Sequence, residues 1–136
     1  MVVDNAGQCV STWGFLASLS SKSKGLGGIV IDGGVRDIRE ISELNFPVFA
    51  RHVVPLSGKR RIRIESINET ISIQDVRIRP GDMVRGDDTG VVVVPAERCK
   101  EVLLEAERLE RLERDYVPLI KAGVSLSDLA SKHGHV

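Results

Sequence analysis

The sequence predicts an α/β protein, and three stretches of the chain carry this prediction. Residues 29–31 form a short apolar run of β-branched side chains, typical of a buried strand, and a glycine pair and a helix-like segment follow it. Between residues 61 and 95, apolar and polar residues alternate between turn sequences, which predicts a β-meander with one buried face. From Pro95 onward, apolar residues recur at helical spacing and predict a long C-terminal helix.

Local signals place the remaining elements. Residues 2–4 predict a short strand that ends in the turn sequence 5–7, and Ser11 or Thr12 is placed to cap a helix that continues to about Lys24. A short helix, a further strand and a last short helix are predicted at residues 38–44, 46–51 and 125–132. The chain has 136 residues, enough for one domain with a core and too few for two, so we expect a single domain over residues 1–136.

The composition argues against several classes of protein. Lys plus Arg and Asp plus Glu each number 19, so the formal net charge is zero and gives no general attraction to nucleic acid or to an acidic membrane. The two cysteines, Cys9 and Cys99, are typical of free thiols in a reducing compartment rather than of a disulfide framework. No apolar run approaches the roughly 20 residues of a spanning helix, and no signal sequence is visible, so we expect a cytoplasmic protein.

An arginine and an aspartate follow the glycine pair at the end of the predicted strand. Loops at strand ends present charged groups to ligands in α/β proteins. There, Asp37 could supply an oxygen ligand to Mg²⁺ while Arg36 clamps a carboxylate, a combination that suits a 2-oxo acid. The spacing of Asp37 and Glu40 is also that of a capping box, and the pattern alone favours this capping role over metal binding.

The start of the first predicted helix is a second candidate site. The backbone amides of its first turn, at Gly14, Phe15, Leu16 and Ala17, lack partners inside the helix and would attract a carboxylate or a phosphate. Gly14 would let such a ligand approach the backbone closely. Every helix has an end of this kind, usually solvated, so the feature points to a site only in combination with others.

The basic run at residues 59–63 has a plainer interpretation than nucleic-acid binding. No aromatic residues are interleaved with its lysine and arginines to stack on bases. Arg61 and Arg63 instead fit one solvated face of a strand. We therefore expect no nucleic-acid partner and no membrane partner.

Other polar clusters also have local explanations. Asp82, Asp87 and Asp88 lie in turn sequences, where aspartate is favoured, and His133 and His135 lie near the chain end, where solvated side chains are typical. No lysine falls inside an apolar strand, where a lowered pKa would suit Schiff-base chemistry. If the protein acts on a carbonyl group, a metal is therefore the better candidate for the electrophile.

Several motifs occur in one collinear order along nearly the whole chain. They are Asp4-Asn5-Ala6-Gly7, Trp13-Gly14-Phe15-Leu16-Ala17, and the stretches at residues 28–37, 46–51, 79–82 and 87–95. Together they resemble the RraA-like family, which includes the 4-hydroxy-4-methyl-2-oxoglutarate aldolases, which also decarboxylate oxaloacetate, and the regulators of ribonuclease E activity. The resemblance implies a β/β/α swivelling-type fold, with a mixed sheet and a β-meander flanked by helices. It also implies a homotrimer or a hexamer with sites between subunits.

The resemblance also implies roles for the candidate residues. Asp37 would bind Mg²⁺ or Mn²⁺, Arg36 would hold the substrate and stabilise an enolate, and the amides of residues 14–17 would bind the pyruvyl carboxylate. The activity implied is that of a metal-dependent class II aldolase, which cleaves small 4-hydroxy-2-oxo acids to pyruvate or decarboxylates oxaloacetate. With the resemblance, metal binding replaces capping as the favoured role of Asp37.

Three departures from the family pattern keep other functions open. Family enzymes usually carry an acidic residue where this chain has Phe15. They also use a carboxylate from a neighbouring subunit, for which Glu107, Glu110 and Glu113 are candidates. An N-terminal segment usually precedes the strand predicted at residues 2–4, so we expect an N-terminally truncated member. The alternatives are a non-catalytic regulator that binds a ribonuclease and an inactive truncated copy.

Overall fold

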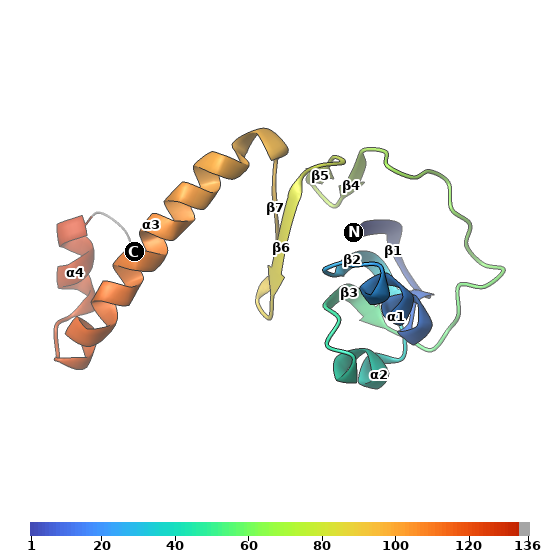
Figure 1. The fold of residues 1–136 in the computed structure, drawn as a ribbon, viewed down its shortest axis with the longest axis horizontal. Coiled ribbons are helices and arrows are strands. Elements are labelled where there is room, and N and C mark those ends of the chain that lie inside the picture. Colours follow the sequence, from blue (N-terminus) through green and yellow to red (C-terminus); the bar gives the residue numbers. More distant parts are fainter. Residues whose placement is uncertain (134–136) are drawn as a thin grey trace. The chain divides into compact units, whose positions relative to one another are not determined.

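The structure is a computed structural model that describes residues 1–133 (Figure 1). The chain falls into two compact units, Met1–Pro95 and Ala96–Val136. We describe each unit by itself. Both halves of the candidate site, Arg36-Asp37 and the start of the first helix, belong to the first unit.

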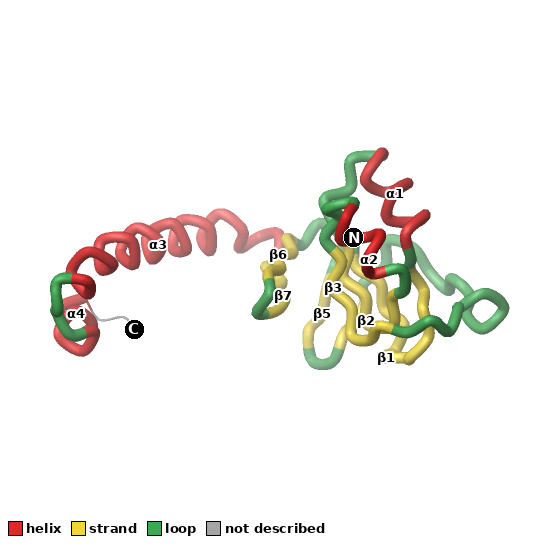
Figure 2. The backbone as a smooth tube through the Cα atoms, turned by 90° about the horizontal axis from the view of Figure 1, so that it is seen from below, coloured by secondary structure: helices red, strands yellow, loops and turns green. Residues whose placement is uncertain are grey.

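A three-stranded parallel sheet forms the centre of the first unit. Its strands lie in the order β1 (Val2–Trp13), β2 (Ile29–Val35) and β3 (Val48–Val53). Helix α1 (Phe15–Ser23) connects β1 to β2, and helix α2 (Ile38–Glu43) connects β2 to β3. Both helices lie on the same side of the sheet (Figure 2). This arrangement of strand, helix and strand brings the carboxyl ends of the three strands to one edge.

The core of this unit is built around β2. Ile29 and Ile31 are almost fully buried and pack with Phe46, while Val3 and Trp13 of β1 pack against this cluster. The β-branched run therefore forms the central strand of the sheet, as its composition predicts. Six of the seven residues of β2 are buried, which explains why this stretch is apolar without alternation.

Strand β1 is longer and more irregular than the sequence suggests. The predicted turn at residues 5–7 is present, because Ala6 and Gly7 have positive φ and the carboxylate of Asp4 accepts a bond from the Ala6 amide at 2.8 Å. The chain then resumes pairing with β2, through register shifts, as far as Trp13. Residues 5–7 are thus a distortion inside one strand and not its end.

The predicted cap of the first helix is wrong. Ser11 and Thr12 lie inside β1, where their hydroxyls donate to the carbonyl oxygens of Trp13 and Gly34 at 2.8 and 3.4 Å. Helix α1 begins at Phe15, and its N-cap is Gly14, which has extended backbone. Continued pairing of β1 with β2 moves the helix start beyond both hydroxyl residues.

The predicted meander is divided into two separate hairpins. One pairs β4 (Ile71–Ile73) with β5 (Val76–Ile78), and the other pairs β6 (Met83–Asp87) with β7 (Gly90–Val94). The three-stranded sheet is entirely parallel, and no antiparallel strand among the described residues joins it to make the mixed sheet that was expected. The α/β class itself is as predicted.

The basic run at residues 59–63 is not a strand face. It lies in a loop that extends from β3 to β4, in which Ile64 is exposed. Arg61 donates to the carbonyl oxygen of Ser57 at 3.0 Å, and Arg63 lies 3.5 Å from the carboxylate of Glu65. The alternation of apolar and basic residues that predicted a strand here is therefore not used for pairing.

The second unit contains a 3₁₀ turn, η1 (Ala96–Arg98), and two helices, α3 (Cys99–Lys121) and α4 (Leu126–His133). The hydroxyl of buried Tyr116 donates to the carbonyl oxygen of Leu129 at 3.1 Å, which joins the two helices. The side chains of His133 and His135 lie outside the described part of the chain. Within residues 1–133, no helix combines the length and the apolar character needed to cross a membrane.

Candidate functional site

The candidate site lies where β1 and β2 end side by side. Trp13, the last residue of β1, is in register with Val35, the last residue of β2. The amide of Arg36 donates to the carbonyl oxygen of Trp13 at 3.0 Å. The residues that follow both strands are therefore held together at the carboxyl edge of the sheet. Parallel pairing alone brings Arg36 and Asp37 to the first turn of α1.

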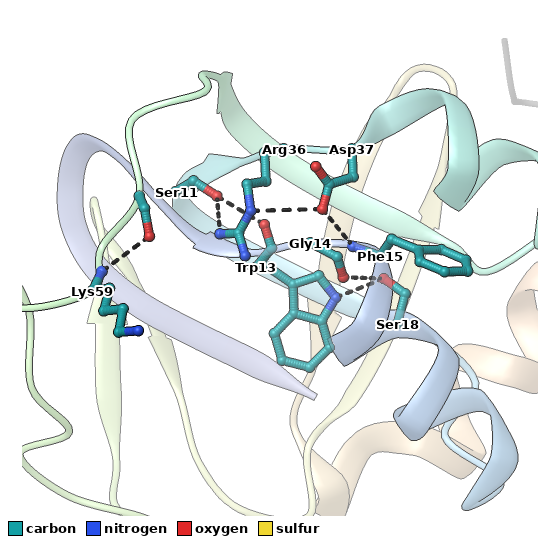
Figure 3. Close-up of polar contacts among 9 residues, drawn as sticks. Ser11, Trp13, Gly14, Phe15, Ser18, Arg36, Asp37 and Lys59 are labelled. Carbon is teal, nitrogen blue, oxygen red and sulfur yellow. Dashed lines mark hydrogen bonds and ion pairs between the residues drawn. The ribbon is translucent and has the colours of Figure 1, made fainter.

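The carboxylate of Asp37 lies directly on the tip of α1 (Figure 3). Its Oδ2 atom accepts a hydrogen bond from the backbone amide of Phe15 at 3.0 Å, and the Nε atom of Arg36 lies 3.6 Å from the same oxygen. The side chains of Arg36 and Asp37 are 41% and 39% exposed. The helix tip thus holds an anion in this structure, and that anion comes from the protein itself.

The predicted capping box at the start of α2 is wrong. Asp37 occupies the N-cap position of α2, but its side chain makes no capping bond to that helix. Its backbone is left-handed, with φ 60° and ψ 38°, a conformation that aspartate tolerates better than most residues. This backbone turns the carboxylate toward α1, so Asp37 caps the neighbouring helix instead of its own.

Gly14 is required by the space that Asp37 and Arg36 occupy. A Cβ atom at this position would lie 2.6 Å from Oδ2 of Asp37 and 3.2 Å from the Cγ and Cζ atoms of Arg36. The backbone of Gly14 is extended, so its conformation alone would accept any residue. The sequence predicts that Gly14 permits close approach of a ligand, and in the structure the group that approaches is Asp37.

Ser11 positions the guanidinium of Arg36. It is almost fully buried, and its hydroxyl accepts a bond from Nη1 of Arg36 at 3.2 Å while donating to the carbonyl oxygen of Trp13. This role of Ser11 could not be predicted from the sequence. No local pattern signals it, because the contact depends on the register shifts that bring Ser11 opposite Gly34.

A second buried serine, Ser18, forms hydrogen bonds to the backbone at the start of α1. The hydroxyl of Ser18 donates to the carbonyl oxygen of Gly14 at 3.1 Å and accepts a bond from Nε1 of Trp13 at 2.9 Å. The amide of Ser18 also donates to the same carbonyl, which makes it the first intrahelical bond of α1. The amides of Leu16 and Ala17 precede this bond and lie in the turn that Phe15 opens.

The glycine pair of β2 serves packing and does not mark the strand's exit. A Cβ at Gly33 would lie 2.8 Å from the Cβ atom of Asn5, and one at Gly34 would lie 2.7 Å from the carbonyl oxygen of Val10. Both glycines are paired with β1 inside the strand. The chain turns after the end of β2 at Asp37, whose backbone is left-handed.

Another arginine and aspartate pair lies within the same sheet. The Nη2 atom of Arg51 lies 2.7 Å from Oδ1 of Asp32, and the side chain of Asp32 is only 9% exposed. The Nε2 atom of His52 lies 3.0 Å from the carbonyl oxygen of Gly7. Since Asp32 belongs to β2 and Arg51 to β3, the ion pair joins two strands. No sequence motif predicted this ion pair.

A divalent cation would find one protein carboxylate at this site. Among the described residues, no group of three or more His, Cys, Asp or Glu side chains is arranged to hold a metal. Asp37, half-exposed, can offer one oxygen ligand, which suits Mg²⁺ or Mn²⁺, ions that keep waters and take further oxygens from substrate. Glu107, Glu110 and Glu113 lie on α3 in the second unit, and their predicted role stays a prediction.

A sequence model of the RraA-like family, described as Aldolase/RraA, matches residues 1–93. The chain belongs to the RraA-like family. The matched segment contains β1 to β3, both connecting helices and every residue of the candidate site except the glutamates of α3. The family resemblance predicted from the sequence motifs is therefore confirmed.

Curated relatives of this RraA-like chain include two that align over most of it. An uncharacterized protein of Methanocaldococcus jannaschii, MJ0644, is 40% identical over 119 residues, which cover 88% of this chain and 57% of the relative. A Halalkalibacterium halodurans protein, provisionally named 4-hydroxy-4-methyl-2-oxoglutarate aldolase, is 37% identical over 130 residues, covering 90% of this chain and 61% of that protein. The chain thus spans about three fifths of the length of these two relatives.

Solved structures confirm the RraA fold. An uncharacterized protein from Pseudomonas syringae pv. tomato superposes with a TM-score of 0.90 at 32% identity, over 94% of this chain and 64% of that one. RraAS2 of Streptomyces coelicolor, described as an unusual member of the RNase ES inhibitor RraA family, superposes with a TM-score of 0.72 at 29% identity, over 85% and 59% of the two chains.

Proposed function

We propose that this protein is a divalent-metal-dependent class II aldolase, which cleaves 4-hydroxy-2-oxo acids to pyruvate, decarboxylates oxaloacetate, or does both. One observation carries the proposal: the carboxylate of Asp37 accepts a hydrogen bond from the first amide of α1, at Phe15, and lies 3.6 Å from the guanidinium of Arg36. A 2-oxo acid presents the complementary groups, a carboxylate beside a carbonyl oxygen. The aldolase name of the Halalkalibacterium relative supports the same activity.

The tip of α1 would bind the carboxylate of the substrate. The amides of Leu16 and Ala17 lie in the first turn, and that of Phe15 is bonded to Asp37. If Asp37 turned away to hold a cation, it would release the Phe15 amide to the substrate. Amide donors at a helix start suit an anion because the helix dipole adds to their hydrogen bonds.

Arg36 would stabilise the negative charge that develops when the carbon–carbon bond breaks. Its Nη1 atom donates to the hydroxyl of buried Ser11, a contact that orients the guanidinium independently of Asp37. A charged donor that is fixed before the reaction lowers the barrier without reorganising during it. A divalent cation on Asp37 would supply electrophilic polarisation of the substrate carbonyl.

The test is a coupled assay of pyruvate release. Oxaloacetate and 4-hydroxy-2-oxo acids would be supplied with Mg²⁺ or Mn²⁺, and each reaction repeated with a chelator. We expect pyruvate to appear with the metal, and its release to fall to the uncatalysed rate with chelator. No release above the uncatalysed rate under either metal would contradict the proposal.

A non-catalytic regulator of a ribonuclease is the second candidate. Its support is the similarity to RraAS2 together with the single carboxylate at the site within the described residues. Such a regulator would bind a ribonuclease with equal affinity whether or not Asp37 is replaced by asparagine. We further propose a homotrimer or a hexamer for either function, which sedimentation analysis would distinguish from a monomer.

A further inference from the structure

Trp13 forms hydrogen bonds through its backbone and through its side chain, at the point where β1 ends and α1 begins. Its carbonyl oxygen accepts bonds from the amide of Arg36 at 3.0 Å and from the hydroxyl of Ser11 at 2.8 Å. Its indole Nε1 atom donates to the hydroxyl of Ser18 at 2.9 Å (Figure 3). One residue therefore connects the segment that carries Arg36 with the helix whose first amides would bind an anion.

Ser18 extends this connection to the start of α1. The indole N–H is a donor only, so the Ser18 hydroxyl accepts from Trp13 and keeps its single proton for the carbonyl oxygen of Gly14, 3.1 Å away. The amide of Ser18 donates to the same oxygen, also at 3.1 Å. Ser18 is 0% exposed, so water does not compete for these bonds.

The carbonyl of Gly14 and the amide of Phe15 belong to one peptide group. This amide donates to Asp37 at 3.0 Å, and in the proposed function a substrate carboxylate takes it over when Asp37 holds a cation. A peptide group is planar, so the bonds from Ser18 to its carbonyl also set the direction of its amide. Gly14 has no side chain to cap the helix. Once Asp37 turns away, Ser18 is left to orient this peptide.

The guanidinium of Arg36 is tied to the same network without the help of Asp37. Its Nη1 atom donates to Ser11 at 3.2 Å, and Ser11 donates to the carbonyl oxygen of Trp13. Ser11 is almost fully buried, and the side chain of Trp13 packs against the apolar core. A continuous series of hydrogen bonds thus connects Arg36, Ser11, Trp13, Ser18 and Gly14.

We propose that Trp13 and Ser18 are positioning residues, which hold the tip of α1 in a fixed orientation toward the guanidinium of Arg36. Neither side chain touches the substrate, because both act through the peptide group between Gly14 and Phe15. This inference rests on the proposed function, since it takes the substrate carboxylate to bind the amides of α1. Donors that are oriented before binding lose little freedom when the ligand arrives, so the network raises affinity more than the rate of the chemical step.

The kinetic test removes the two polar groups and leaves the packing. Trp13→Phe keeps an aromatic ring against the core without the N–H group, and Ser18→Ala removes the hydroxyl. With oxaloacetate and Mg²⁺ we expect Ser18→Ala to raise KM about five-fold, the size of one hydrogen bond, and to change kcat less than about two-fold. Because Trp13 acts through Ser18, adding Trp13→Phe to Ser18→Ala should raise KM no further. An unchanged KM in Ser18→Ala, or effects of the two substitutions that multiply, would overturn the proposal.

Ser23 provides the matched control on the same helix. Its hydroxyl also donates to a backbone carbonyl oxygen, that of Ser20 at 2.8 Å, but it lies at the opposite end of α1. Ser23→Ala removes a comparable bond from the helix and leaves the peptide group between Gly14 and Phe15 untouched. We expect it to leave KM unchanged. A rise equal to that in Ser18→Ala would show that general loosening of α1 sets the affinity, and would overturn the proposal.

A spectroscopic measurement separates this inference from catalysis. Trp13 is the only tryptophan, so its indole N–H gives one signal in a ¹H–¹⁵N NMR spectrum. An anion on the Phe15 amide polarises the peptide group and strengthens the bonds that link Gly14, Ser18 and Trp13. We therefore expect pyruvate, added with Mg²⁺, to shift this signal in the wild type. In Ser18→Ala the shift should be much smaller and pyruvate should bind about five-fold more weakly.

The positioning role and the aldolase activity fail in different ways in these experiments. An indole signal that pyruvate shifts in the wild type but not in Ser18→Ala, without pyruvate release from any substrate, would retain the positioning role and reject the aldolase. Pyruvate release together with an indole signal that bound pyruvate leaves unchanged would retain the aldolase and reject the positioning role. Neither binding of pyruvate nor its release by the wild type would overturn both.

Discussion

Two pairs of arginine and aspartate, one between β2 and β3 and one just after the end of β2, differ in how closely they are joined. Arg51 and Asp32 are 2.7 Å apart, and Asp32 is 9% exposed; Arg36 and Asp37 are 3.6 Å apart, and both are about two fifths exposed. A short, buried pair between neighbouring strands holds the sheet together. A longer, open pair at the strand end leaves both charged groups accessible to a ligand. The same residue types thus serve structure at one position and suit a binding site at the other.

Breaking the buried pair should cost the most stability. Asp32→Ala leaves Arg51 without its carboxylate, and we expect the free energy of unfolding to fall by about 2 kcal/mol, less than for a fully buried pair because Arg51 is 38% exposed. Denaturant titration would measure it, with Asp37→Asn as the control. A loss no larger than that of the control would show that the buried pair does not hold the sheet.

Adding a side-chain atom at Gly14, next to the more exposed pair of Arg36 and Asp37, should have a smaller effect on stability. Gly14→Ala places a Cβ 2.6 Å from the Asp37 carboxylate, which can move because it ends a side chain. The bond to the Phe15 amide would be lost, and we expect a loss of about 1 kcal/mol, typical of a removed helix cap. Thermal unfolding would measure this loss, and pyruvate release would fall as well. Unchanged stability and activity would show that the contact is unimportant.

The two ion pairs differ in how far they could be predicted from the sequence, because a local pattern determines one and the alignment of strands determines the other. Asp37 and Arg36 could be predicted because a strand followed by charged residues is a local pattern and because the family motif includes them. The contact of Arg36 with Ser11 could not, since it depends on register shifts in β1. The pair of Asp32 and Arg51 joins residues 19 positions apart, whose proximity is set only when β2 and β3 align.

The same distinction explains the errors elsewhere in the fold. The alternating pattern at residues 61–64 predicts a strand, but a strand forms only where a partner is available, and this stretch has none in the described sheets. Ser11 has the chemistry of a cap, but pairing of β1 extends past it to Trp13. Local pattern determined the type of the strongest elements, while tertiary pairing determined where they end.

The smallest effect on stability is expected at a third carboxylate, that of Asp87, which lies exposed beside a turn. Hydrogen bonds from the hydroxyl and the amide of Thr89 hold the pKa of Asp87 below its ordinary value. Because the folded pKa is lowered, the stabilisation is present above the ordinary pKa and is lost as the pH falls through the folded value. In Thr89→Ala we expect the pKa of Asp87, measured by NMR titration of its carboxyl carbon, to rise toward the ordinary value. An unchanged pKa would exclude the hydroxyl as the main cause.

The most direct test of the open pair is pyruvate release by Asp37→Asn. Asparagine tolerates the left-handed backbone and retains an oxygen for the Phe15 amide, so the fold should remain within about 1 kcal/mol of the wild type. With Mg²⁺ or Mn²⁺ present, we expect release from oxaloacetate or a 4-hydroxy-2-oxo acid to fall at least about 100-fold, because the charge that would hold the cation is gone. Release at the wild-type rate by a folded Asp37→Asn protein would contradict the account.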